Sequence, residues 1–97
     1  MQELSKKIEF FNEYDFEGKK VTGCIIRKPR LKDRNQALRI ARANNADEEE
    51  TDNIYFSIIT DLPKEFFDDV IFSEDFGLIN RANNNFLGLG TKMSATL

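Results

Sequence analysis

The sequence predicts a single α+β domain over residues 1–97, with an N-terminal β-hairpin followed by three α-helices and one short helical turn. Two extended segments flank Glu17-Gly18, and glycine accepts the positive φ that tight hairpin turns require. After Pro29 the apolar residues recur at helical spacing instead. A hydrophobic content of 40% with nine Phe is too high for a disordered chain, so these elements must share a core.

The β-hairpin is expected over residues 6–28. Its parts are two strands at 6–11 and 20–28 and an irregularity at 12–14. Pro29 ends the second strand, because it has no N–H group and restricts the residue before it. Cys24 lies in this apolar strand. Since the chain has one Cys and no His, we expect a buried thiol rather than a disulfide, a zinc site or a catalytic pair.

The helical part is expected over residues 31–88, beginning with a helix at 31–43 that is rich in good helix formers. Asn44-Asn45 ends this helix. Its apolar stripe is predicted to comprise Leu31, Ala37, Leu38, Ile40 and Ala41. Asp47 is expected to cap the second helix, because Glu50 follows three residues later in a capping-box arrangement. The face that this second helix buries is predicted to carry Ile54, Ile58, Ile59 and Leu62.

The rest of the helical part follows Pro63, which is expected to close the second helix and to open the short turn "PKEFFDDV", anchored by its two Phe. Ser73 is expected to cap the last helix. Its apolar face is predicted to carry Phe76, Ile79, Ala82, Asn83 and Phe86, with Leu78 and Leu87 at the flanks. Gly88 and Gly90 stop this helix, and residues 89–97 are expected to form a flexible tail.

The charge of the chain reverses abruptly between residues 25 and 50. The basic run contains Arg27, Lys28, Arg30, Lys32, Arg34, Arg39 and Arg42, opposed only by Asp33. Taken alone, this run is typical of nucleic-acid binding. However, eleven acidic residues follow between Asp47 and Asp75 against Lys64 alone, and no aromatic residue interleaves the basic run. We therefore expect the basic helix to meet acid from the second helix or from a neighbouring copy.

The acidic residues do not predict a metal site or an active site. The stretch "ADEEETD" has no Gly for a calcium loop, and carboxylates at a helix N-terminus are stabilised by the helix dipole. Asp68-Asp69 is interpreted as a solvated pair in a surface turn. We therefore predict no enzyme activity and no catalytic, cofactor-binding or metal-binding residues. No apolar run reaches the roughly 18 to 20 residues of a membrane span, and no signal-peptide pattern opens the chain.

The hairpin is predicted to be apolar on both faces, because neighbouring strand residues point to opposite sides. Phe10 and Phe11 cannot both face the helices. Val21 and Ile25 are expected on one face, and Cys24 and Ile26 on the other. Since three short helices cover only one face of a two-stranded hairpin, the other face is expected to bind a partner.

The order of these features resembles the small tail assembly chaperones of long-tailed phages, particularly the Mu-like group. The resemblance runs from residue 6 to residue 88 and rests on "YDFEGKK" across the turn, on "IIRKP" before the first helix, and on "LPKEFFDDVIFSEDFGLINRANNNFLG". In that family a strand ending in a basic residue and Pro leads into the helices, as Arg27-Lys28-Pro29 does here. The last helix there follows an acidic stretch and ends in a Phe-Leu pair, which residues 73–76 and Phe86-Leu87 match.

The resemblance implies a non-enzymatic protein of the bacterial host cytoplasm, without cofactors. It would bind the tape measure protein and keep it soluble until tail tube subunits replace it. Its expected partners are the tape measure protein, the tail tube protein and further copies of itself, with no membrane. The residues expected to contact partners are Phe11, Val21, Ile25, Arg34, Arg39, Phe86 and Leu87. Two alternatives stay open: a small nucleic-acid-binding regulator that uses the basic helix at 31–43, and a structural protein of the virion.

Overall fold

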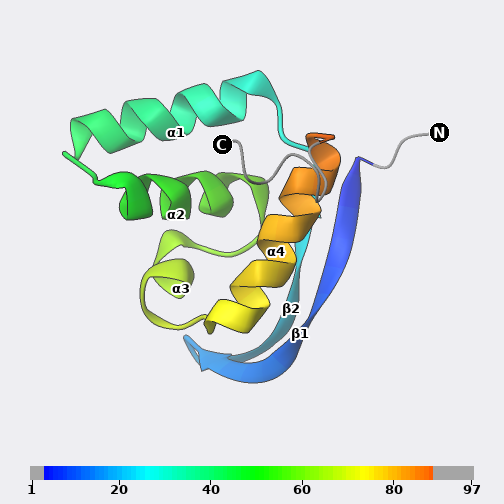
Figure 1. The fold of residues 1–97 in the computed structure, drawn as a ribbon. Coiled ribbons are helices and arrows are strands. Elements are labelled where there is room, and N and C mark those ends of the chain that lie inside the picture. Colours follow the sequence, from blue (N-terminus) through cyan, green and yellow to red (C-terminus); the bar gives the residue numbers. More distant parts are fainter. Residues whose placement is uncertain (1–3, 89–97) are drawn as a thin grey trace.

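The computed structural model describes residues 4–88 and has the α+β arrangement that the sequence predicts (Figure 1). In chain order the elements are β1 (Ser5–Phe16), β2 (Lys19–Arg27), α1 (Leu31–Ala43), α2 (Glu48–Ile59), α3 (Lys64–Asp69) and α4 (Ser73–Phe86). Helix α4 lies along the hairpin, and α1 packs on α2 at one end of the molecule (Figure 1). The expected tail at residues 89–97 lies outside the described residues.

The hairpin turns at Glu17-Gly18, as predicted, with φ of 51° and 77° at the two turn residues. Both values are positive, which is the geometry of the tight turns that suit the twist of paired strands. The antiparallel strands pair from Ser5 opposite Arg27 to Phe16 opposite Lys19. The first strand therefore extends well beyond the predicted 6–11, and the second lies one residue earlier than the predicted 20–28.

The irregularity predicted at residues 12–14 is a bulge in β1 that covers residues 10–13. Pairing passes from Glu9 opposite Gly23 directly to Tyr14 opposite Val21, so residues 10–13 stand against Thr22 alone. Below the bulge the strands approach closely: a Cβ on Gly23 would lie 2.3 Å from the carbonyl oxygen of Ile8. Glycine is therefore required at position 23, and the bulge bends the hairpin around α4.

Helix α1 has the predicted bounds, but its apolar stripe is narrower than expected. Ala37 and Ala41 are buried and pack with Ile54 of α2. Leu31 and Ile40, expected in the stripe, are exposed. Two small alanines of α1 are sufficient for its packing contact with α2, so the larger side chains at the edges of the stripe stay in solvent.

Helix α2 begins as predicted, with the Asp47 side chain accepting a hydrogen bond from the Glu50 N–H at 2.8 Å. It ends at Ile59, before the predicted stop at Pro63. The reason is tertiary: Thr60 leaves the helix to form a bridge with Ile26 of β2. The segment after α2 thus continues along the free edge of β2.

The last two helices differ from the prediction at their starts. Pro63 is the N-cap of α3 rather than its first helical residue, and the N-cap of α4 is Phe72, so Ser73 does not cap this helix. The first turn of α4 also carries Asp75, whose carboxylate is fully buried and accepts hydrogen bonds from β1 instead of capping the helix. Within the Asn run of α4, Asn83 is buried and accepts a hydrogen bond from the Tyr55 hydroxyl at 2.8 Å.

The core is an aromatic cluster between the hairpin and the helices, with Phe66 of α3 at its centre and fully buried. Its ring lies 5.2 Å from that of Tyr14 and 5.4 Å from that of Phe16, both edge-on. The cluster is completed by Ile8, Cys24, Ile26, Phe56, Ile59, Leu62, Phe67, Ile79 and Ala82. Phe10 faces this core and Phe11 faces solvent, which confirms that the two point to opposite sides.

An ion pair between the half-exposed Arg27 and the buried Asp33 joins the end of β2 to the start of α1. The Arg27 guanidinium donates to both oxygens of Asp33, at 2.6 and 2.8 Å, and to the Ile58 carbonyl at 3.1 Å. Asp33 also accepts from the Arg30 N–H at 2.8 Å, which satisfies the start of the helix. These bonds, first of all the one from Arg27, lower the pKa of Asp33 to about 2.

We expect this ion pair to make stability depend on pH at the acidic end. Since the pKa of Asp33 falls from 3.8 to about 2, its ionised form contributes about 2 kcal/mol to folding at neutral pH. A carboxyl whose folded pKa is depressed stabilises above its unfolded pKa, and this contribution is lost as the pH falls through about 2. Denaturant titrations of wild type and Asp33→Asn should therefore differ at neutral pH and converge between about pH 4 and pH 2. A difference that stays constant with pH would contradict this role.

Candidate functional site

The surface of residues 4–88 carries seven large apolar side chains that the fold leaves exposed. They are Leu4, Phe11, Ile25, Leu31, Ile40, Phe72 and Leu87. An exposed apolar residue is ordinary when it is isolated, so the informative property is where these side chains gather. Most of them belong to three places: a groove along the hairpin, the bulge end of the molecule, and a groove beside α1.

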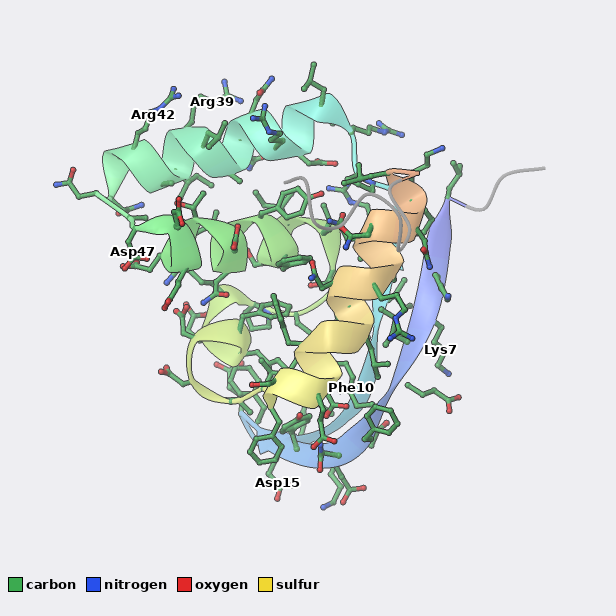
Figure 2. All side chains as sticks on the ribbon, viewed as in Figure 1. Lys7, Phe10, Asp15, Arg39, Arg42 and Asp47 are labelled. Carbon is green, nitrogen blue, oxygen red and sulfur yellow. The ribbon has the colours of Figure 1, made fainter. Side chains whose placement is uncertain are left out.

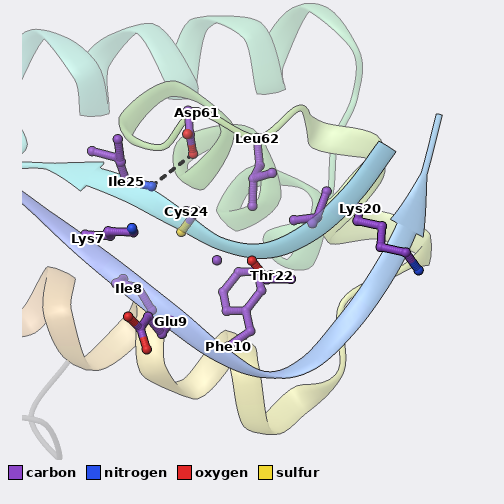
Figure 3. A pocket seen from close by; sticks show the side chains of 12 residues that line it. Lys7, Ile8, Glu9, Phe10, Lys20, Thr22, Cys24, Ile25, Asp61 and Leu62 are labelled. Atoms are coloured by element: carbon purple, nitrogen blue, oxygen red, sulfur yellow. Dashed lines mark hydrogen bonds between the residues drawn. The ribbon is translucent and has the colours of Figure 1, made fainter. Parts of the chain in front are cut away.

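The first place, the hairpin groove, follows the gap that the bulge opens between β1 and β2 (Figure 3). It has a volume of about 540 Å³. It is lined by Lys7, Ile8, Glu9, Phe10, Lys20, Val21, Thr22, Gly23, Cys24, Ile25, Asp61 and Leu62. The Ile25 N–H donates to the Asp61 carboxylate at 3.0 Å, which fixes the backbone while the Ile25 side chain stays half exposed.

Cys24 borders this groove but is not a reactive thiol. It is buried, as predicted, and pairs with Ile8 across the strands. Burial, together with the negative charge of Asp61, raises the pKa of Cys24 to about 12. Since the thiolate is the nucleophile and the metal ligand, Cys24 serves as a packing residue.

The second place, the aromatic end, consists of Phe11 in the bulge and Phe72 before α4, which are 71% and 57% exposed. Both backbones are held by Asp75. The Phe11 N–H donates to the Asp75 carboxylate at 2.7 Å, and the Phe72 N–H donates at 3.0 Å to the Tyr14 hydroxyl, which itself donates to Asp75 at 2.5 Å. The aromatic end is therefore rigid although its rings face solvent.

Asp75 is a buried carboxylate that is solvated by neutral donors instead of by a cation. Asn12 completes its hydrogen bonds, donating from its side-chain amide at 3.0 Å. Burial by itself raises the pKa of Asp75, but the hydrogen bonds from Tyr14, Asn12 and the Phe11 N–H outweigh it and leave the pKa below its ordinary value. Asp75 therefore stays ionised at neutral pH and fixes the bulge.

The third place, the leucine groove, lies between α1, α2 and the C-terminal end of α4 and has a volume of about 600 Å³. It is lined by Pro29, Arg30, Leu31, Arg34, Ala37, Leu38, Thr51, Asp52, Tyr55, Asn83 and Leu87. Leu31 and Leu87 are 71% and 49% exposed at its mouth. Arg30 and Arg34 stand on the α1 side, and Asp52 is the acidic residue on the α2 side.

The five apolar residues among the predicted contact residues fall into two groups. Phe11, Ile25 and Leu87 are exposed, and each belongs to one of the three places. Val21 and Phe86 are partly buried against the core. Val21 was expected on the outer face with Ile25, but the bulge shifts the register so that Val21 pairs with the buried Tyr14.

Sequence reasoning missed the exposure of Leu31 and Phe72. Leu31 is predicted in the buried stripe of the first helix. It is the first residue of that helix, however, and lies beyond the contact that Ala37 and Ala41 make with α2. No burial or exposure is predicted for Phe72, which precedes the expected Ser73 cap. Phe76 lies one turn after Phe72 as an available apolar partner, so no local pattern indicates the exposure of Phe72.

The basic side chains of α1 do not pair with α2 in the part of the chain that the structure describes. Arg34, Arg39 and Arg42 are exposed, and Figure 2 shows Arg39 and Arg42 on the side of α1 that faces away from α2. The ion pair of the basic run joins Arg27 to Asp33 of the same run, and in α2 Glu50 pairs with Lys64 at 3.8 Å. Of the two expected arrangements for the basic helix, contact with acidic side chains of a neighbouring copy therefore remains a prediction.

Residues 4–88 contain neither a candidate metal cluster nor a helix suited to cross a membrane. The acidic and Cys side chains in this range form no group of three or more that could hold a metal ion. None of its helices combines the length and the apolar character needed to cross a membrane. Comparison with known proteins finds no matching family model, no similar curated protein and no similar solved structure.

Proposed function

We propose that this protein is a tail assembly chaperone of a long-tailed phage or prophage, acting in the cytoplasm of the bacterial host. It binds the tape measure protein and keeps it soluble until the tail tube polymerises around it. The observation that carries the proposal is the surplus of uncovered apolar surface: seven large apolar side chains remain exposed among residues 4–88. The resemblance to tail assembly chaperones indicates the partner that would cover this apolar surface, the tape measure protein.

The hairpin groove is the surface that we assign to the tape measure protein. Its apolar positions, chiefly Ile25, are bordered by Lys7 and Lys20 and by Glu9 and Asp61, so both signs of charge are present. Apolar surface with a polar rim is typical of protein-interaction sites. A tape measure protein presents long amphipathic helices, and a concave strand surface with charges of both signs can receive the apolar side chains of such a helix and pair with its flanking charges.

Co-expression with the tape measure protein of the same phage tests this assignment. The wild-type chain should keep the tape measure protein in the soluble fraction. Ile25→Asp should lose most of this effect, because the buried apolar contact is worth about 1.5 kcal/mol or more, which is at least about tenfold in Kd. The fraction of soluble tape measure protein after centrifugation is the measurement.

The matched control is Ile40→Asp, which introduces the same change at an exposed position outside the three places. It should solubilise the tape measure protein as well as the wild type does. Equal loss in both variants would show a general effect of charge on the chain, and an insoluble tape measure protein with the wild-type chain would refute the proposed function.

A nucleic-acid-binding regulator is the second candidate, because the side chains of Lys32, Arg34, Arg39 and Arg42 are exposed on α1. Such a protein should shift DNA in a gel at low salt, and its affinity should fall steeply as salt is added. A third candidate, a structural virion protein, would remain in purified particles, where mass spectrometry detects it. A chaperone would be absent from these particles.

A further inference from the structure

We propose that copies of this protein assemble head to tail, with the aromatic end of one copy inserted into the leucine groove of the next. The inference does not depend on the proposed function. It rests on two complementary surfaces of one chain, both of which residues 4–88 leave uncovered.

The aromatic end is suited to be the inserted part. Phe11 and Phe72 project from backbone that the buried Asp75 network already fixes. Because their backbone is ordered before contact, little conformational freedom is lost on binding. Rigid aromatic side chains that enter a pocket are the usual anchors of protein interfaces.

The leucine groove is suited to receive these rings. Leu31, Leu38 and Leu87 supply apolar surface from two elements, and the volume of about 600 Å³ is large enough for aromatic side chains. Helices α1 and α2 contact each other through small side chains, Ala37 and Ala41, which is why the larger leucines remain at the mouth of the groove.

The charges around the two surfaces are complementary. Beside the aromatic end, Glu13, Asp15 and Glu74 carry three exposed carboxylates against the ammonium of Lys20, which pairs with the first two. At the leucine groove, Arg30 and Arg34 outnumber Asp52. An acidic end therefore meets a basic one, which favours the head-to-tail orientation and disfavours contact between like ends.

The position of the two surfaces determines the kind of assembly. Phe72 directly precedes α4 and Leu87 directly follows it, so the 14 residues of this helix separate them by about 21 Å along its axis. Since different surfaces meet, the contact is heterologous, and repeated copies form a ring or an open stack instead of a two-fold dimer.

Two variants that each retain one surface test the proposal. Phe11→Ser with Phe72→Ser removes the aromatic end, and Leu31→Glu with Leu87→Glu blocks the groove. All four side chains are about half exposed or more, so both variants should fold, which circular dichroism checks. In sedimentation velocity the wild type should form species larger than a dimer at high concentration and low salt, and each variant should lose every species larger than the monomer.

Mixing the two variants gives the decisive result. The intact aromatic end of one should enter the intact groove of the other, which yields a dimer with one copy of each variant and nothing larger. A wild-type chain that stays monomeric, variants that assemble like the wild type, or a mixture that contains only monomers would each overturn the proposal. If the groove variant alone loses the tape measure protein while the wild type is monomeric, the groove belongs to that partner instead.

Discussion

Replacing Asp75 by Ala should destabilise the fold by about 2 to 5 kcal/mol, because it leaves buried donors without an acceptor. The Tyr14 hydroxyl and the Phe11 N–H both donate to this carboxylate, and Tyr14 is itself buried. Small domains have about 5 to 15 kcal/mol of stability in total, so the variant should be partly unfolded well below the wild-type midpoint. Equilibrium unfolding in urea measures the difference.

The neighbouring residue supplies the control for this prediction. Glu74 also accepts a hydrogen bond from Asn12, at 3.0 Å, but it is exposed and water can replace it. Glu74→Ala should therefore change stability by no more than about 0.5 kcal/mol. If Asp75→Ala proved equally mild, the bulge would not depend on the buried carboxylate, and the rigidity that we assign to the aromatic end would be wrong.

Replacing Phe66 by Ala should cost about 3 to 5 kcal/mol, because the variant leaves a cavity at the centre of the aromatic cluster. Phe66 is fully buried, and four rings surround it, those of Phe10, Tyr14, Phe16 and Phe67. Three of these rings come from β1 and one from α3 itself, so the loss should loosen the contact between hairpin and helices. Near-ultraviolet circular dichroism and urea unfolding should both report it.

Phe11→Ala is the matched control for the core variant, since it makes the same substitution on the same strand that carries Phe10. Its side chain is 71% exposed, so the change in stability of the monomer should stay within about 0.5 kcal/mol. Equal losses from the two variants would contradict the assignment of Phe66 to the centre of the core.

The elements of this fold follow from local chemistry and were predictable from the sequence. The turn at Glu17-Gly18 follows from the freedom of glycine, and the start of α2 from the capping side chain of Asp47. The bounds of α1 follow from its helix formers and from the asparagines after it. In each of these cases the residues that decide the structure are neighbours in the chain.

The tertiary role of the two buried carboxylates was not predictable in the same way. Asp33 and Asp75 look like ordinary acidic residues in the first turn of a helix, where solvent exposure is the usual result. Their burial depends on partners elsewhere, Arg27 at the end of β2 and Tyr14 beyond the bulge. Tyr14 and Asp75 are 61 residues apart, and no local pattern connects them.

Likewise, the sequence predicts that some apolar surface stays exposed, but it does not predict where all of this surface lies. The two apolar faces of the hairpin indicated that some large side chains would remain uncovered, and Ile25 and Phe11 are among them. The leucine groove depends on how far α1 sits from α4. The small residues Ala37 and Ala41, through which α1 contacts α2, set that distance. Helical periodicity does not reveal how closely two helices pack.

The bond between Tyr14 and Asp75 also dictates an order of events during synthesis. The hairpin leaves the ribosome before the helices, but its bulge lacks its acceptor until the start of α4 has been translated 61 residues after Tyr14. Two strands alone are marginal in water, so the nascent hairpin must wait for the C-terminal helix before it becomes stable. The hairpin is therefore synthesised before the helices but becomes fixed only together with them.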